Sequence, residues 1–273
     1  MTVDLNQELT TQARQRRNFA LRHVPQDAPR VLEIGAFDNP TFSNALGDNV
    51  RYLDYFTRDE LRAMHQDNPR RRLDKAVHVD FVVKGRNIAD QIQSETNYRF
   101  DLIVANHVIE HVPDIIFWFR QLERLLNPQG RVFLAVPDRR YTFDYFRPET
   151  IATQIVRAHV EGIDKPSKWQ LAESYYYHQK VNLAALWSGN RPRVFRPRFS
   201  LKEALRLAEE RCATYTDTHC WVFTPPSFTR CMSDIASLGV TKLGITAIEG
   251  PAPSTNEFWT ILSPPQAAVA GGG

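Results

Sequence analysis

Residues 106–111, Asn-His-Val-Ile-Glu-His, bring two imidazoles and a carboxylate into one short stretch of the chain. Neutral imidazole can take a proton from a hydroxyl group, so His107 or His111 could act as a general base. Together with a distant histidine, the same groups could instead hold a divalent metal ion. In a third interpretation, Glu110 and His111 hydrogen-bond the backbone and fix a turn. The residue types leave all three interpretations open.

The spacing His107-x-x-Glu110-His111 also matches an inverted zinc-protease signature. Such proteases carry the motif within a long helix. Here the apolar run Phe100–Ala105 predicts a strand directly before the motif, and Pro113 follows two residues after it. The sequence therefore disfavours a protease.

A second group of candidate residues follows the predicted strand Val31–Ile34, which leads into a loop that begins with Gly35. NAD-binding loops need two further glycines, one for close approach of the backbone to the diphosphate and one for helix packing. Phe37 and Pro40 stand at those positions. A cofactor without a diphosphate, such as S-adenosylmethionine, makes no such demand. The loop therefore opposes NAD and permits a methyl donor.

Polar residues also stand at the ends of the next predicted strands. Asp54 ends the second strand, from which a carboxylate can accept hydrogen bonds from both hydroxyls of a ribose. We expect Asp80 to end the third strand, within reach of an adenine amino group, and Asn106 to end the fourth. Polar residues at the ends of several successive strands indicate a cofactor site more specifically than any one of these residues does alone.

Short apolar runs separated by long connections predict parallel strands joined by crossovers, and so an α/β fold. Amphipathic helices are expected at 113–127 and, with Thr224 as N-cap, at 225–238. The five parallel strands are predicted at Val31–Ile34, Val50–Leu53, Ala76–Val79, Phe100–Ala105 and Arg131–Val136, and further strands at His219–Phe223, Val240–Ile248 and Glu257–Leu262.

Over roughly residues 28–138 and 215–263, the sequence resembles the class I S-adenosylmethionine-dependent methyltransferases. It is similar to a bacterial branch with three characteristic segments, which here are Leu32–Pro40, Ala105–His111 and Val136–Asp144. The resemblance implies a Rossmann-like sheet of seven strands, the last antiparallel, with helices on both faces. The single glycine departs from the commoner Gly-x-Gly pattern of these enzymes.

The resemblance also implies which residues contact the cofactor. Glu33 and Gly35 would face the methionine end, Asp54 the ribose, Asp80 and Phe81 the adenine, and Asn106 the edge nearest the methyl group, with Ala36, Phe37 and Tyr55 as further cofactor-binding residues.

The His-Glu-His segment is similar to Glu-x-x-Glu-His in metal-dependent O-methyltransferases, such as the RNA 3′-terminal 2′-O-methyltransferases and the quinone-pathway enzymes. A further histidine before Trp or Phe belongs to that pattern, and His219 matches it here. The resemblance implies a metal site of His107, Glu110, His111 and His219 for Mg, Mn or Zn. His107 in place of Glu shifts the set toward nitrogen ligands. A bound ion would lower the pKa of a substrate hydroxyl.

The sequence divides into five parts. We expect a lead-in helix in 1–27, an S-adenosylmethionine-binding core in 28–138, a mostly helical insertion that forms a substrate lid in 139–214, completion of the sheet in 215–263 and a disordered tail in 264–273.

The insertion is the basic part of an almost neutral chain. The whole chain has 34 Lys and Arg against 31 Asp and Glu, a balance that does not suit a general nucleic-acid coat protein. Residues 139–211, in contrast, have 14 Lys and Arg against 8 Asp and Glu. Asp138, Arg139 and Tyr141 stand where an open α/β sheet binds ligands and are candidate substrate contacts. The loop 191–198 has four arginines around Phe195 and could bind a phosphate, an acidic sugar or single-stranded RNA.

These features predict an S-adenosylmethionine-dependent O-methyltransferase that acts on a hydroxyl of a sugar, an oligosaccharide or a related small molecule. His107 and His111 would handle the proton, with or without a metal. The alternatives are an RNA 2′-O-methyltransferase and a non-catalytic cofactor-binding protein. No run of 18 apolar residues exists, and the N-terminus is polar. We therefore expect a cytoplasmic protein without membrane contact, and a homodimer stays open.

Overall fold

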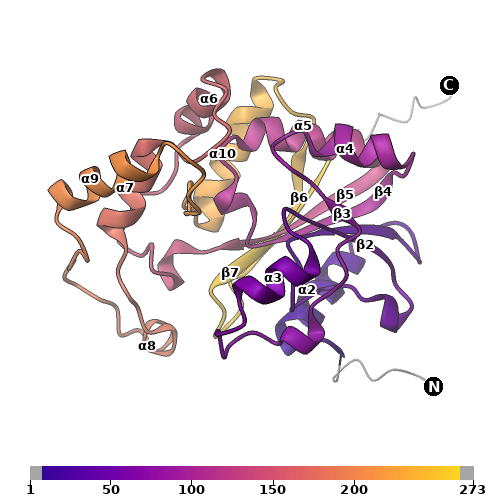
Figure 1. Cartoon of the computed structure of the whole chain (residues 1–273), viewed down its shortest axis with the longest axis horizontal. Coiled ribbons are helices and arrows are strands. Elements are labelled where there is room, and N and C mark those ends of the chain that lie inside the picture. Colours follow the sequence, from indigo (N-terminus) through magenta and orange to yellow (C-terminus); the bar gives the residue numbers. More distant parts are fainter. Residues whose placement is uncertain (1–7, 265–273) are drawn as a thin grey trace, which may run out of the picture.

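A computed structural model describes residues 8–264 of the chain, whose centre is a seven-stranded sheet (Figure 1). The strand order is β3-β2-β1-β4-β5-β7-β6, and β7 runs antiparallel to both of its neighbours. The α/β fold with an antiparallel last strand is therefore confirmed. The strands are β1 (Arg30–Ile34), β2 (Asn49–Asp54), β3 (Phe81–Val82), β4 (Phe100–Asn106), β5 (Leu126–Pro137), β6 (Gly244–Glu249) and β7 (Glu257–Ser263).

Helices cover both faces of the sheet, as predicted. Alternate residues of a strand point to opposite faces, so Ile103 of β4 packs toward one group of helices and Val104 toward the other. The first group is α4 (Ile88–Glu95), α5 (Ile115–Leu125), α6 (Ala152–Val160) and α10 (Pro225–Ser237), and α2 (Thr11–Leu21) covers the other face. Both faces of β4 are therefore buried, which explains its continuous apolar run.

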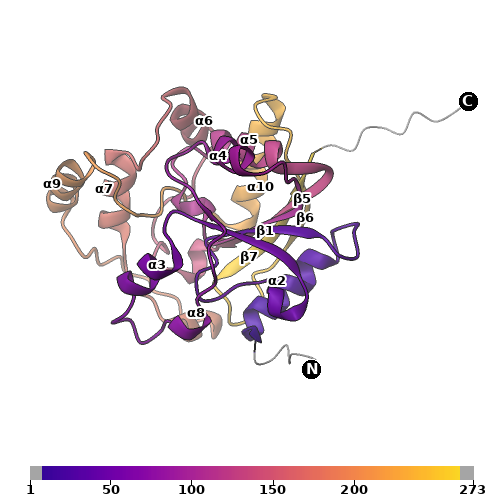
Figure 2. The ribbon, with the colours of Figure 1, turned by 45° about the vertical axis from the view of Figure 1, so that its right-hand side comes forward.

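Most of the chain between β5 and α10 lies beyond the ends of the strands. In both ribbon views, α7 and α9 stand apart from the sheet (Figures 1 and 2). They share a small core of their own, in which Leu171 and Ala172 meet Ala208. This region contains α7 (Lys168–Tyr177), α8 (Leu183–Trp187) and α9 (Leu201–Arg211), and the shorter helices elsewhere are η1 (Asn44–Leu46), α3 (Arg58–Met64), η2 (Leu73–Lys75), η3 (Ile109–His111) and η4 (Arg139–Tyr141).

The predicted third strand is wrong in its position. Residues 76–79 form no strand, and β3 is only Phe81–Val82. Val79 packs instead with Phe37 and Leu61 in a small cluster beside the sheet, and the Val77 N–H donates to the carbonyl oxygen of Phe37. The apolar character of this run reflects that cluster rather than strand pairing.

The predicted strand at 219–223 is also wrong. Residues 220–223 are buried, but the backbone groups of this segment bind η3 and a loop rather than a neighbouring strand. The Cys220 N–H donates to the Glu110 carbonyl, and Thr150 exchanges backbone and side-chain hydrogen bonds with Val222. A single bridge between Asp138 and Phe223 remains. The predicted tail lies outside the described residues except for Pro264.

Candidate active site

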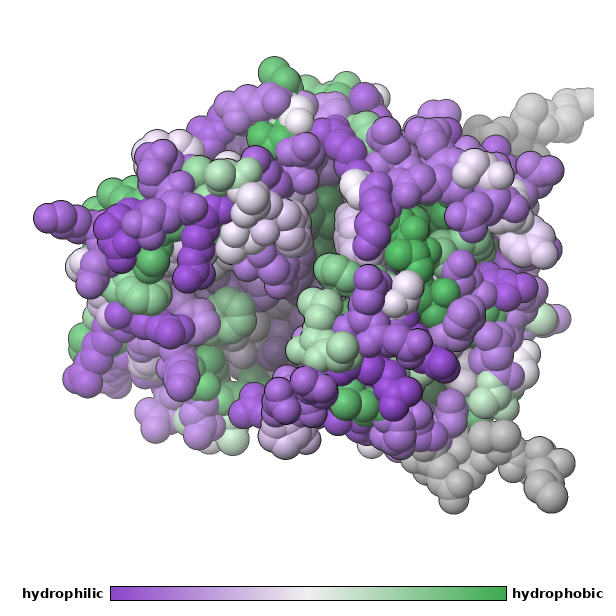
Figure 3. All heavy atoms as spheres, viewed as in Figure 1, coloured by the Kyte–Doolittle hydropathy of each residue, from purple (hydrophilic) through white to green (hydrophobic). Residues whose placement is uncertain are grey.

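The candidate site lies where the carboxyl ends of β1, β4 and β5 face the insertion. These strands are neighbours in the sheet, so the residues that follow them meet at one edge. Figure 3 shows that the surface is hollowed between the insertion and the strand ends. The sheet order therefore brings together predicted site residues that are far apart in the sequence.

The loop after β1 approaches the turn after β4 closely. Gly35 has a φ of 70°, in the left-handed region, and a Cβ there would lie 3.3 Å from the Cγ2 of Val108. Phe37 also has a positive φ, of 42°, and its ring is buried against Leu61 and Val79. Gly35 is therefore required by both conformation and space, and Phe37 serves packing.

Glu33 and Asn106 meet beneath this loop. Glu33 is fully buried and accepts hydrogen bonds from the N–H groups of Thr41 at 2.7 Å and Phe42 at 3.0 Å. The amide of Asn106 donates to Glu33 at 3.1 Å and to the Thr41 hydroxyl at 2.8 Å. Burial outweighs these hydrogen bonds and raises the pKa of Glu33 to about 7. Both side chains hold the loop in place.

Asp54 is the carboxylate at this edge that is most open to a ligand. It is half-buried at the end of β2, and one oxygen accepts the N–H of Phe56 at 3.2 Å. Burial raises its pKa, and no side chain among residues 8–264 hydrogen-bonds it. Tyr55 beside it is 50% exposed. A carboxylate with free acceptor positions suits a group that donates two hydroxyls.

Asp80 does not stand where the sequence placed it, because β3 begins after this residue. Its carboxylate accepts hydrogen bonds from the Arg51 side chain at 2.8 Å and from the Tyr52 N–H at 2.9 Å. Phe81 and Ala36 are buried. The carboxylate of Asp80 is therefore hydrogen-bonded to residues of β2.

Glu110, His111 and His219 form a compact cluster. One possible ligand atom from each lies within 4.8 Å of the others. The first two belong to η3 and the third to the loop before α10. Glu110 is 1% exposed, and neither of its carboxylate oxygens has a hydrogen-bond partner. A buried carboxylate that has ion-pair contacts with His107 and His111 but no hydrogen bond of ordinary geometry is incompletely compensated, so this cluster has the character of a ligand set.

Each histidine of the cluster is supported by its own carboxylate. The Nδ1 of His111 lies 2.8 Å from Asp217, and the Nδ1 of His219 lies 2.6 Å from Asp144. Such pairs fix the orientation of a metal-binding imidazole and leave Nε2 as the ligand atom. The Nε2 of His111 is 3.8 Å from Glu110. Burial disfavours a charged His111, but the Asp217 hydrogen bond outweighs it and raises the pKa of His111.

His107 lies beside the cluster and is held between two carboxylates. Its φ is 53°, its Nε2 is 2.6 Å from Glu257, and its Nδ1 is 3.5 Å from Glu110. Burial opposes the charged ring, but the close contacts with both carboxylates outweigh it and raise the pKa of His107 to about 9. Arg16 binds Glu257 with two hydrogen bonds, and Trp259 donates to it at 2.7 Å. A protonated ring has no free lone pair, so this geometry does not support His107 as a base.

The family model of the methyltransferase domain matches residues 5–235. The chain belongs to this family. It is an S-adenosylmethionine-dependent methyltransferase, which confirms the predicted enzyme class. No curated protein sequence matches the chain.

Solved structures with the same general arrangement are distant. The CcbJ methyltransferase from Streptomyces caelestis is 11% identical, with 97% of this chain and 100% of that chain covered and a TM-score of 0.42. The glycopeptide N-methyltransferase MtfA is 14% identical, with 93% and 90% covered and a TM-score of 0.44. The mitomycin 7-O-methyltransferase MmcR is 11% identical, with 93% and 54% covered and a TM-score of 0.41. Likenesses this weak assign no substrate to this methyltransferase.

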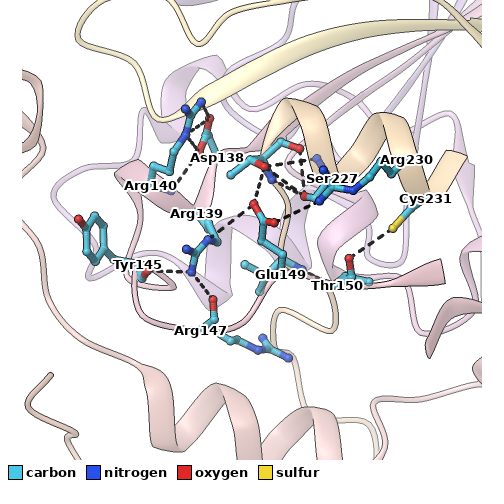
Figure 4. A network of polar contacts seen from close by, with 12 residues as sticks. Asp138, Arg139, Arg140, Tyr145, Arg147, Glu149, Thr150, Ser227, Arg230 and Cys231 are labelled. Atoms are coloured by element: carbon cyan, nitrogen blue, oxygen red, sulfur yellow. Dashed lines mark hydrogen bonds and ion pairs between the residues drawn. The ribbon is translucent and has the colours of Figure 1, made fainter. Parts of the chain in front are cut away.

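Two of the predicted substrate-contact residues of the methyltransferase instead hydrogen-bond other groups of the protein. Asp138 is fully buried, and Arg140 donates to both of its oxygens, at 2.9 and 2.6 Å (Figure 4). The guanidinium of Arg139 donates to the carbonyl oxygens of Tyr145 and Arg147. Tyr141 lines an open pocket of about 360 Å³. Among residues 8–264, no helix has the length and apolar character needed to cross a bilayer.

The sequence interpretation missed the residues that support the histidines. In the sequence, Asp144 is the last residue of the segment Val136–Asp144. Nothing there indicates its contact with His219, which lies 75 positions further along the chain. Asp217 stands two positions before His219, a spacing that carried no signal for a contact with His111. Arg147, 2% exposed, donates at 2.6 Å to the carbonyl oxygen of His219.

Proposed function

We propose that the methyltransferase acts on a hydroxyl group of a saccharide or a related small molecule and holds a divalent metal ion at Glu110, His111 and His219. The observation that supports the metal site is the carboxylate of Glu110, which is buried, has no hydrogen-bond partner and lies between two oriented imidazoles. A mixed nitrogen and oxygen donor set of this kind suits Zn or Mn, and Mg less well.

The metal would supply a positive charge that polarises the hydroxyl and lowers its pKa. The residues of the chain do the positioning. Asp217 and Asp144 hold the two imidazoles by their Nδ1 atoms and so aim Nε2 at the site. The charged ring of His107 balances Glu257 and Glu110. With Nδ1 on Asp217 and Nε2 on the ion, His111 would be a ligand rather than a base, and the charge of the ion would ease loss of the hydroxyl proton to solvent.

S-adenosylmethionine supplies a methyl group on a positively charged sulfur. In the proposal, Asp54 accepts the ribose hydroxyls, and Gly35 leaves room for the backbone to approach the cofactor. Glu33 and Asn106 act indirectly, because they fix the loop that Gly35 begins. Transfer needs the acceptor oxygen, the methyl carbon and the sulfur in line, so a rigid loop and a rigid strand end serve the reaction.

Metal content tests the proposal. The purified protein is incubated with Mg, Mn or Zn, desalted and analysed by mass spectrometry of the elements. We expect one ion per chain in the wild type and none in Glu110→Gln. Glu249→Gln is a matched control, because Glu249 has an exposed pair with Arg22 at 3.4 Å, and it should keep the ion. Absence of any ion from the wild type would refute the metal site.

The acceptor is tested separately, with methyl transfer to saccharides that carry free hydroxyls. Transfer to an oxygen, identified by mass spectrometry of the product, supports the proposal. Transfer only to nitrogen acceptors contradicts it.

A further inference from the structure

A pocket of about 360 Å³ is lined by the segment that follows β5. Its wall combines aromatic and basic side chains from η4, from the loop that follows η4 and from the region of α8. The lining residues are Arg139, Arg140, Tyr141, Tyr145, Phe146, Leu186 and Arg191. This composition suits a ligand with both a ring and a negative charge.

Only one of the three arginines in the pocket is free to bind a ligand charge. Arg140 is paired with Asp138, and Arg139 donates to backbone carbonyls and lies 4.0 Å from Glu149 (Figure 4). Arg191 is exposed, and within residues 8–264 its guanidinium has no carboxylate partner. The pocket therefore carries an unbalanced positive charge at Arg191.

The loop that carries Arg191 is anchored by an aromatic residue. The ring of Phe195 lies 5.4 Å from Phe146, which lines the pocket, and 5.4 Å from Tyr177 in a stacked arrangement. Gln179 also accepts the backbone N–H of Arg196 at 2.8 Å. These contacts hold the middle of the loop, at Phe195 and Arg196, and Arg191 at its start lines the pocket.

The pocket lining also includes a flat ring. Tyr141 stacks on Trp187 with their centroids 4.4 Å apart and their planes at 10°. Trp187 is fixed by a hydrogen bond of 2.8 Å from its indole N–H to the Thr255 carbonyl. Because Tyr141 lines the pocket and Trp187 does not, the stack presents a rigid aromatic surface to the pocket. A sugar ring packs well on such a surface.

The pocket is connected to the metal cluster through the chain itself. Asp144, which binds His219, directly precedes the pocket residue Tyr145. Phe143 contacts the ring of His219 at 4.6 Å. The segment that lines the pocket therefore also carries the residues that contact His219.

We propose that this pocket binds the negatively charged group of the acceptor, and that the acceptor is a saccharide with a phosphate or a carboxylate group. Arg191 pairs with the anion and Tyr141 packs against the sugar ring. That the bound molecule is the methyl acceptor rests on the proposed function. Its binding to the pocket needs neither the metal nor methyl transfer.

Binding of three simple probes tests the inference. Glucose 6-phosphate, glucuronate and glucose are titrated into the full chain in separate experiments followed by protein NMR. We expect at least one of the charged sugars to bind about tenfold more tightly than glucose, because a charge-assisted hydrogen bond contributes about that factor. The stronger of the two identifies phosphate or carboxylate as the recognised group.

Two arginine variants locate the interaction. Arg191→Ala should weaken binding of the charged sugar about tenfold, and Arg191→Lys should restore part of it. Arg193→Ala is the matched control, because Arg193 is exposed on the same loop but does not line the pocket, and it should change the affinity less than about twofold. Glu110→Gln should leave the affinity unchanged, so failure of the metal site and failure of this inference are distinguishable.

Three results would overturn the inference. The first is equal affinity for glucose and both charged sugars, or no binding of any probe up to about 10 mM. The second is an equal loss in Arg191→Ala and Arg193→Ala, which would indicate a general electrostatic attraction. The third is tighter binding of a single-stranded RNA oligonucleotide, with steep salt dependence and sensitivity to both variants, which would favour the RNA 2′-O-methyltransferase alternative.

Discussion

Glu33 and Glu110 are both buried carboxylates at the same edge of the sheet, but their surroundings are opposite. Glu33 accepts two backbone N–H groups and an amide, so all that it binds belongs to the protein. Glu110 has no hydrogen bond and faces histidines. Burial raises the pKa of Glu33, whereas the charges of His107 and His111 outweigh burial and lower the pKa of Glu110. The comparison separates a carboxylate that builds a loop from one that is free to bind a ligand.

The sharpest test of this comparison exchanges each carboxylate for an amide. We expect Glu110→Gln to lower metal affinity by about 100-fold or more, because a charged ligand is lost, while Glu33→Gln keeps the wild-type affinity. Calorimetric titration with Zn or Mn measures both. Equal affinities in the two variants would remove the distinction between the sites.

A third carboxylate, Asp54, extends the comparison to the cofactor. Asp54→Ala should lower the affinity for S-adenosylhomocysteine about 100-fold, because two hydroxyl hydrogen bonds to a charged group are lost. Circular dichroism should show an intact fold, since the hydrogen bonds that this carboxylate accepts come from the neighbouring backbone N–H groups of Tyr55 and Phe56. Asp90→Ala, which removes an exposed carboxylate from α4, serves as the control. Unchanged cofactor affinity would contradict the ribose assignment.

Replacing the carboxylates that hydrogen-bond the two histidines should lower metal affinity by an intermediate amount. Asp144→Asn leaves His219 in place but weakens its orientation, so metal affinity should fall about 10- to 100-fold. Asp217→Asn should lower metal affinity less, because the pair that Asp217 forms with His111 is more exposed. The same titration measures both variants. A loss as large as that of Glu110→Gln would show that Asp144 is itself a ligand.

The last prediction concerns stability rather than affinity, namely the pH dependence of stability that Glu33 confers. Its pKa is about 7 in the folded protein, against an ordinary value of 4.5 for a solvated glutamate, so the folded state binds the proton more strongly than the unfolded chain does. Stability from this group is present below about pH 4.5 and is lost as the pH rises through 7, by up to about 3 kcal/mol. Urea unfolding between pH 5 and 8 should therefore show the wild type losing stability relative to Glu33→Gln. Parallel pH profiles would mean that Glu33 is ionised throughout.

Periodicity and caps predicted the parts of the fold that neighbouring residues determine. The helix after Thr224 begins at Pro225, as the capping residue and the proline indicated. The buried runs of β1 and β4 were found because strands covered on both faces have few polar positions. An apolar run does not reveal its partner, however, and the segments 76–79 and 219–223 pack against other parts of the chain without belonging to the sheet.

The site followed the same rule. Glu110 and His111 could be recognised because they are adjacent in the sequence, and His219 because it matched a family pattern. Glu257, which binds His107, is 150 residues away from it, and nothing near His107 indicates that contact. Side chains that support a ligand carry no local pattern of their own, so only the folded chain reveals them.

The position of β7 has a consequence for how the protein is made. This strand is the last in the sequence but lies between β5 and β6, and its first residue is Glu257. A ribosome makes this strand after the other six strands of the sheet, so His107 and Arg16 lack their shared partner until β7 has emerged. Until then β5 has an unpaired edge, which favours aggregation. The nascent chain therefore depends on its final strand both to close the sheet and to finish the site.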